Sequence, residues 1–115
     1  MPLSITCRFV ANGLFDNKED KKYFLSSCAK YDWRQYLRYL DELKLLDIRN
    51  DIKNIKAKSL ILIVKQDTTI PMKNQLQVLS LIPKAEKSYV DSNHALIANT
   101  PEAVNSILKD WFKSY

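Results

Sequence analysis

The stretch Leu60–Val64 constrains the fold more than any other part of the chain. All of its residues are apolar. Lys58 lies shortly before the stretch and Lys65 directly after it, and most of the neighbouring residues are also polar. A strand that is apolar on both faces suits the interior of a parallel sheet, where helices cover the two faces. We therefore expect a buried strand over residues 59–64, inside an α/β domain that supplies further strands.

Residues 57–115 are predicted to alternate strands with helices. Pro71 and Pro101 each precede a run in which apolar residues recur at helical spacing, and proline suits the first turn of a helix. Thr100 is placed to cap the second of these helices. The expected elements are a strand over 59–64, a helix over 72–82, a strand over 85–90 and a helix from residue 101 onward. This β-α-β-α order is typical of parallel strands joined by crossover helices, so the predicted fold class is α/β.

The first half of the chain carries no such alternation. Residues 1–15 are interpreted as an irregular apolar segment, or as a strand that adds to the sheet. Residues 16–56 indicate helices alone: Asp16 with Glu19 has the spacing of a capping box, and Asp32 is placed to cap a second helix. That second helix is expected to bury one apolar face, made of Trp33, Tyr36, Leu37, Leu40 and Leu43.

The predicted sheet is too small for the helices around it. Two strands cannot cover helices on both faces, although Leu60–Val64 is apolar all round. Either residues 1–10 add a strand, or another chain supplies the rest of the sheet. We therefore expect the sheet to be incomplete without a partner, which would be a missing N-terminal half or a second copy, because unpaired strand edges favour association.

Composition excludes several classes of site. The 115 residues fit one domain and include a single glycine, Gly13, whereas phosphate-binding and dinucleotide-binding loops need several glycines. Two cysteines and one histidine are too few for a disulfide framework or a zinc site. We therefore expect no cofactor and no metal, and we interpret Cys7 and Cys28 as buried thiols of a cytoplasmic protein.

The distribution of charges and the length of the apolar runs indicate which classes of partner to expect. The net charge of +5 arises from 18 basic and 13 acidic residues that are mixed along the chain, which is typical of solvated helix faces and does not favour nucleic acid. The apolar runs are far shorter than the roughly 20 residues that cross a bilayer. The N-terminal residues show neither a basic region nor an apolar core of the kind found in signal peptides. A membrane partner is therefore not expected.

Polar residues follow both predicted strands, at the ends where parallel strands meet. Asp67 lies in the loop after the first strand, and His94 lies in the loop after the second. Functional groups gather at the carboxyl ends of strands in open α/β sheets. A carboxylate beside an imidazole holds one tautomer and stabilises the protonated ring. Asp67 and His94 are therefore the candidate catalytic acid and base, and Asp91 is an alternative neighbour for His94.

This pattern resembles the C-terminal part of α/β-hydrolases. The resemblance rests on the apolar strand, Asp67 followed four residues later by Pro71, then His94, and then Pro101-Glu102 opening the last helix. Acid before base is also the order of that fold. The resemblance covers residues 44–115 and, more loosely, residues 14–45 as a helical cap. It implies hydrolysis of a carboxylic ester or thioester.

Three departures from the family's pattern matter. Val64 and Asn93 stand where the family usually has glycine, before the acid and directly before the histidine. The nucleophilic serine stands on a Gly-x-Ser-x-Gly turn, and a chain with one glycine contains no such turn. Cys7 and Cys28 are weak substitutes, since neither lies on a predicted strand-to-helix turn. We therefore expect acid and base without a nucleophile, and no hydrolysis by this chain alone.

The resemblance also implies a substrate and a partner. Ser92–Ile97 looks most like the esterases that cleave the methyl ester of pimeloyl–acyl-carrier protein in biotin synthesis. Such an enzyme meets an acidic carrier protein, for which Arg34 and Arg38 on the helical cap are the candidate contacts. The competing hypothesis is a non-enzymatic binding or assembly module, which pairs through the exposed sheet edge and the apolar helices.

Overall fold

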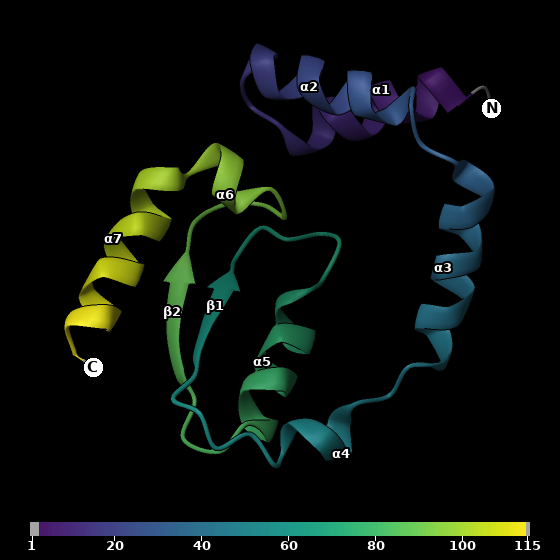
Figure 1. The fold of residues 1–115 in the computed structure, drawn as a ribbon. Coiled ribbons are helices and arrows are strands. Elements are labelled where there is room, and N and C mark those ends of the chain that lie inside the picture. Colours follow the sequence, from purple (N-terminus) through teal and green to yellow (C-terminus); the bar gives the residue numbers. More distant parts are fainter. Residues whose placement is uncertain (1–2, 115) are drawn as a thin grey trace. The chain divides into compact units, whose positions relative to one another are not determined.

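A computed structural model describes residues 3–114 of the chain (Figure 1). The chain divides into two compact units, one ending at Ile48 and the other beginning at Arg49. None of the helices described is long and apolar enough to cross a membrane.

The first unit holds three helices, α1 (Leu3–Leu14), α2 (Lys18–Cys28) and α3 (Trp33–Leu45). Helices α1 and α2 lie side by side and bury Cys7, Ala11 and Cys28 between them (Figure 1). The expectation of an irregular segment or a strand over residues 1–15 is therefore wrong for residues 3–14. Cys7 and Ala11 are four residues apart, so they share one helical face, and their small side chains let a second helix approach closely.

The helix starts follow the sequence, with one shift. The side-chain oxygen of Asn17, rather than Asp16, caps α2 by accepting the backbone N–H of Asp20 at 2.8 Å. Asp32 caps α3 as predicted, and one of its oxygens accepts the N–H groups of Arg34 at 3.0 Å and of Gln35 at 3.4 Å. A cap satisfies N–H groups that have no partner within the helix, which fixes where the helix begins.

The apolar face of α3 is exposed, which corrects the prediction that it is buried. Trp33 is half-buried, and its indole N–H donates to the carbonyl of Cys28 at 3.2 Å. The rest of the face is exposed, namely Tyr36, Leu37, Leu40 and Leu43. Helical spacing identifies which side of a helix is apolar, but it does not show whether the same chain covers that side.

The second unit has the predicted β-α-β-α core. Its elements are α4 (Arg49–Ile52), β1 (Leu60–Val64), α5 (Met72–Leu81), β2 (Glu86–Val90), α6 (Leu96–Asn99) and α7 (Pro101–Lys113). Strands β1 and β2 pair in parallel, with Leu60 opposite Glu86 and Val64 opposite Val90. Helix α5 packs against β1 and α7 against β2 (Figure 1). The expected α/β class and strand order are confirmed.

The core of this unit lies around the carboxyl ends of the strands. Ile63 is fully enclosed, and Val64, Val90, Ile82 and Val104 are buried beside it. This burial follows from the apolar run, because Ile63 and Val64 point to opposite faces of the sheet and both faces are covered. The ends of β1 and β2 are thus the most firmly packed part of the unit.

Strand β1 pairs with β2 along one of its two edges, and no described strand pairs with the other edge. The N–H of Glu86 donates to the carbonyl of Ser59 at 2.9 Å, and the N–H of Lys65 donates to the carbonyl of Val90 at 3.0 Å. In a parallel strand both backbone groups of a residue point the same way and successive residues alternate. The backbone N–H and carbonyl groups of the odd-numbered residues of β1 therefore point toward β2. Those of Leu60, Leu62 and Val64 point toward the other edge of the strand. Because residues 3–10 lie in a helix, they do not add a strand here.

Candidate active site

The loops that follow β1 and β2 bring Asp67 and His94 together. Pairing between the loops continues past the strands, since the N–H of Gln66 donates to the carbonyl of Ser92 at 3.0 Å. The His94 Nδ1 atom lies 2.9 Å from Oδ2 of Asp67. The neighbour of His94 is therefore Asp67, whereas Asp91 accepts a hydrogen bond from the side chain of Gln66 at 3.0 Å.

Asp67 is held as an ionised carboxylate. Its side chain is 6% exposed, and its Oδ1 atom accepts the N–H groups of Thr69 and Ile70, both at 2.8 Å. Burial alone raises the pKa of this carboxyl, but the hydrogen bonds from Ile70, His94 and Thr69 outweigh burial and lower the pKa below its ordinary value. At neutral pH the carboxylate can only accept, so the Nδ1 atom of His94 carries the proton.

This arrangement leaves the other ring nitrogen of His94 with a free lone pair. When Nδ1 donates to Asp67, the neutral ring presents Nε2 as an acceptor. The His94 side chain is 42% exposed, against 6% for Asp67. An exposed imidazole backed by a buried carboxylate can take a proton from a hydroxyl group and return it to a leaving group. That is the chemistry this pair can perform.

Asn93 shapes the loop that carries His94. Its side-chain oxygen accepts the N–H of Ala95 at 2.9 Å and the amide of Asn99 at 3.0 Å. The backbone of Asn93 is not left-handed, because Lys84 is the one non-glycine residue with positive φ in the described chain. Asn93 therefore replaces glycine without strain and contributes through its side chain. The short helix α6 that follows was not predicted from the sequence.

Thr100 behaves differently from the prediction. It precedes α7, but its hydroxyl donates to the carbonyl of Leu96 at 2.9 Å and makes no capping bond to α7. Pro101 still occupies the first turn of α7, where its missing N–H costs nothing. The hydroxyl of Thr100 thus secures α6, the element directly after His94.

Sequence reasoning missed Gln75, a buried polar residue on α5. Its side-chain oxygen accepts the N–H of Val64 at 2.7 Å, and its amide donates to the carbonyl of Val64 at 3.1 Å and of Ile70 at 2.8 Å. These bonds fix both ends of the loop around Asp67. The sequence gives little signal for this role, since a glutamine beside Leu76 looks like part of a solvated helix face.

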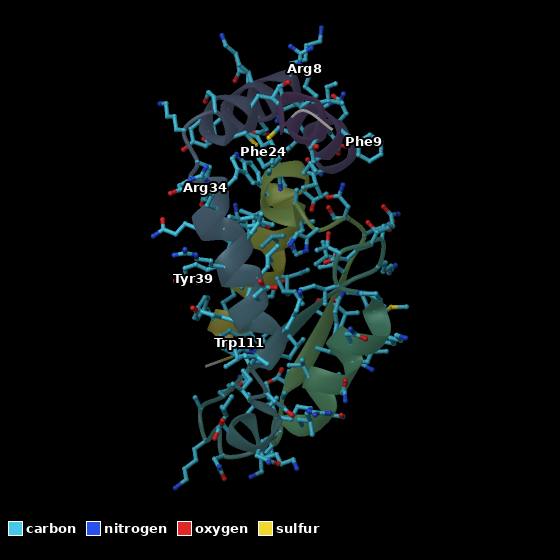
Figure 2. The ribbon with its side chains drawn as sticks, turned by 90° about the vertical axis from the view of Figure 1, so that its right-hand side faces the viewer. Arg8, Phe9, Phe24, Arg34, Tyr39 and Trp111 are labelled. Atoms are coloured by element: carbon cyan, nitrogen blue, oxygen red, sulfur yellow. The ribbon has the colours of Figure 1, made fainter. Side chains whose placement is uncertain are left out.

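The remaining candidates lie in the first unit. Cys7 and Cys28 are buried free thiols. Burial, and then a hydrogen bond with Cys7, raise the pKa of Cys28 to about 11, so this thiol stays protonated at neutral pH and is a poor nucleophile. Arg34 and Arg38 lie one turn apart on α3 and are exposed; Figure 2 shows Arg34 and Tyr39 reaching outward. Across residues 3–114, no cluster of three side chains suited to hold a metal is found.

Comparison with known proteins identifies the fold. No family model and no curated protein sequence matches the chain. A predicted CIB-like hydrolase from Thermoplasma acidophilum superposes with a TM-score of 0.56 and 23% identity, over 59% of this chain and 33% of that one. The α/β-hydrolase enzyme MGS-MChE2, from the metagenome of sediments from the Mar Chica lagoon in Morocco, superposes with a TM-score of 0.56 and 22% identity, over 85% of this chain and 40% of that one.

The extent of these matches limits what they show. The chain spans 33% and 40% of the two solved hydrolases, so it corresponds to a part of each. At this level of identity the likeness establishes the fold, whereas function must be argued from the site. The chain therefore has the fold of part of an α/β-hydrolase, in which a two-stranded parallel sheet carries Asp67 and His94 at its carboxyl end.

Proposed function

We propose that this chain contributes the acid and the base of an α/β-hydrolase site that acts on carboxylic esters or thioesters. The observation that carries the proposal is the hydrogen bond of 2.9 Å between His94 and Asp67. The carboxylate is buried and held by two backbone N–H groups, while the imidazole is more exposed. A structural ion pair needs no such asymmetry, but a general base must reach its substrate.

In this proposal His94 carries out the proton transfers, and Asp67 orients and stabilises its ring. Nε2 of His94 accepts the proton of a serine hydroxyl as the serine oxygen bonds to the substrate carbonyl carbon. The protonated ring, stabilised by Asp67, then gives that proton to the leaving alcohol or thiol as its bond to the carbonyl carbon breaks. Water repeats the cycle with the acyl-enzyme and releases the acid.

In this proposal the nucleophile lies outside these 115 residues, in an N-terminal portion or in a partner. The sequence has one glycine and therefore no Gly-x-Ser-x-Gly turn. Outward-facing backbone groups of Leu60 and Leu62 lie at a sheet edge where no described strand pairs with them. The portion with the remaining strands, in the same polypeptide or in a partner, would supply both the serine and the oxyanion-binding N–H groups. The chain alone is then inactive.

A serine-directed probe tests this proposal. A tagged chain is mixed with an extract of its native cells, and captured proteins are treated with a fluorophosphonate, which labels activated serines. We expect a labelled partner with the native chain, and capture without labelling with the His94→Ala and Asp67→Asn variants. Labelling that is equal with all three chains contradicts the proposal, as does esterase activity of the purified chain that survives His94→Ala.

We propose a narrower substrate class on the basis of the helical segment. Arg34 and Arg38 are exposed on one side of α3, where they can meet an acidic surface. Together with the likeness of Ser92–Ile97 to the biotin-synthesis esterases, this favours an ester of an acidic carrier protein in the cytoplasm. Replacing both arginines by glutamate should then abolish binding of an acyl-carrier protein at low salt, with no loss of fold. Unchanged binding contradicts this substrate.

The alternative is a non-enzymatic assembly module. The observation that favours it is the exposed apolar face of α3, which lines a cavity of about 750 Å³ with Tyr31, Tyr36 and Leu40 among its walls. Exposed apolar patches of this kind mark sites of association. Under this alternative, Leu40→Glu abolishes capture of the partner, whereas His94→Ala changes neither capture nor any activity of the complex.

A further inference from the structure

Gln75 occupies an unusual position for a glutamine. It lies on α5 with 9% of its surface exposed, and all of its described hydrogen bonds go to the backbone of one short stretch. Burying an amide without partners is unfavourable, so the bonds explain why this residue can be buried. The groups that these hydrogen bonds connect indicate the role of Gln75.

The bonds of Gln75 close the loop that carries Asp67. Val64 is the last residue of β1, and both its N–H and its carbonyl are bound by Gln75 at 2.7 and 3.1 Å. Ile70 ends the loop, and its carbonyl accepts from the same amide at 2.8 Å. The residues between Val64 and Ile70 therefore have both ends fixed to one side chain on a helix.

Ile70 links this clamp to the acid. Its carbonyl is bound by Gln75, while its own N–H donates to Oδ1 of Asp67 at 2.8 Å. The other oxygen of Asp67 faces Nδ1 of His94 at 2.9 Å. A continuous set of hydrogen bonds thus runs from Gln75 through Ile70 and Asp67 to His94, so Gln75 acts on the pair through the loop backbone.

We propose that Gln75 is the positioning residue of the Asp67–His94 pair, an inference that rests on the proposed function of that pair. Side-chain networks of this kind hold a functional carboxylate within a narrow range of positions. The role needs a side chain as long as glutamine that accepts the Val64 N–H and donates to the carbonyls of Val64 and Ile70. Methionine offers neither group, and an ionised glutamate offers only the acceptor.

The single histidine makes the test direct. His94 is the one histidine in the sequence, so its ring nitrogens give the only imidazole signals in a two-bond ¹H–¹⁵N spectrum. In the neutral ring of the native chain, we expect the Nδ1–H tautomer that Asp67 selects. In Gln75→Met we expect a shift toward the Nε2–H tautomer that free histidine prefers in water.

The control is a second glutamine on the same helix. Gln77 is exposed, so Gln77→Met makes the same change in side chain without removing a clamp, and it should leave the His94 spectrum native. Fold is checked by circular dichroism and by the dispersion of the amide signals. If Gln75→Met does not fold, Gln75→Glu replaces it, because it keeps the bond to the Val64 N–H and loses both bonds that the amide donates.

The outcomes separate this inference from the proposed function. A folded Gln75→Met or Gln75→Glu variant that retains the native Nδ1–H tautomer overturns the role of Gln75. If His94 keeps the Nδ1–H tautomer in Asp67→Asn, the acid–base pair itself is overturned, whatever Gln75 does. A native Nδ1–H signature that is lost in both Asp67→Asn and Gln75→Met, and kept in Gln77→Met, supports both.

Discussion

The Oδ2 atom of Asp67 lies 2.9 Å from Nδ1 of His94, although 27 residues separate them in the chain. The parallel pairing of β1 with β2 produces this contact, because it sets both loops at the same end of the sheet. The positions of Asp67 and His94 therefore depend on how firmly the ends of β1 and β2 are held.

The stability of the second unit should fall in acid because of Asp67. Hydrogen bonding lowers the pKa of Asp67 in the folded chain below its ordinary value. A lowered folded pKa adds stability above the unfolded pKa, which is about 3.9 for aspartate, and that stability is lost as the pH falls through the folded value. Urea unfolding between pH 7 and pH 2 should therefore show a smaller loss for Asp67→Asn than for the native chain. Asp110→Asn, at an exposed site on α7, is the control.

Ile63 should be the residue of β1 whose truncation costs most. It is 0% exposed, so Ile63→Ala should lower the free energy of unfolding by about 2–5 kcal/mol, and Ile63→Val by about 0.5–1.5 kcal/mol. Ile97→Ala, at a site that is 74% exposed, should cost less than about 0.5 kcal/mol. Urea unfolding followed by Trp111 fluorescence in a Trp33→Phe background reports on the second unit. Equal costs at the two sites would contradict the packing of β1.

The two cysteines should resist alkylation while the first unit is folded. Cys7 and Cys28 are buried, and the raised pKa of Cys28 keeps it in the unreactive thiol form. Iodoacetamide at pH 7 should therefore modify neither residue at the rate of a free thiol, and should modify both once urea is added. Mass spectrometry counts the adducts. Rapid modification of Cys28 in the native chain would show that α1 and α2 do not bury it.

The exposed face of α3 should tolerate charge. Leu37 is 61% exposed, so Leu37→Glu should change the free energy of unfolding by less than about 0.5 kcal/mol. It should also reduce binding of a hydrophobic dye to the native chain, because the apolar face is interrupted. A large loss of stability would mean that Leu37 is covered in solution. Cys28→Glu, at a buried site on α2, provides the destabilised reference.

The sequence was sufficient where local pattern and chain order decide the outcome. The continuous apolar run predicted β1, the proline before each periodic run predicted where α5 and α7 begin, and the positions of Asp67 and His94 after successive strands predicted their contact. Each of these depends on short-range signals or on the parallel pairing rule. The catalytic use of the two residues stays a prediction.

The sequence was insufficient where the outcome depends on contacts between distant residues. The α1 helix was missed because Asn12-Gly13 indicated a turn, whereas Gly13 keeps a negative φ inside the helix. Burial of the α3 face was wrongly expected, because amphipathic spacing cannot show whether a cover is present. Gln75 was missed because its partners are backbone groups of Val64 and Ile70, which no sequence pattern marks.

The double bond from Gln75 to Val64 also bears on aggregation. An open strand edge can recruit other chains and extend into fibrils, and proteins commonly shorten or obstruct such edges. On the outer side of β1, Gln75 already satisfies both backbone groups of Val64, which leaves those of Leu60 and Leu62 as the exposed template. A strand arriving in the wrong register would have to displace a buried side chain. Gln75 therefore shortens the open edge of β1 by the two backbone groups of Val64.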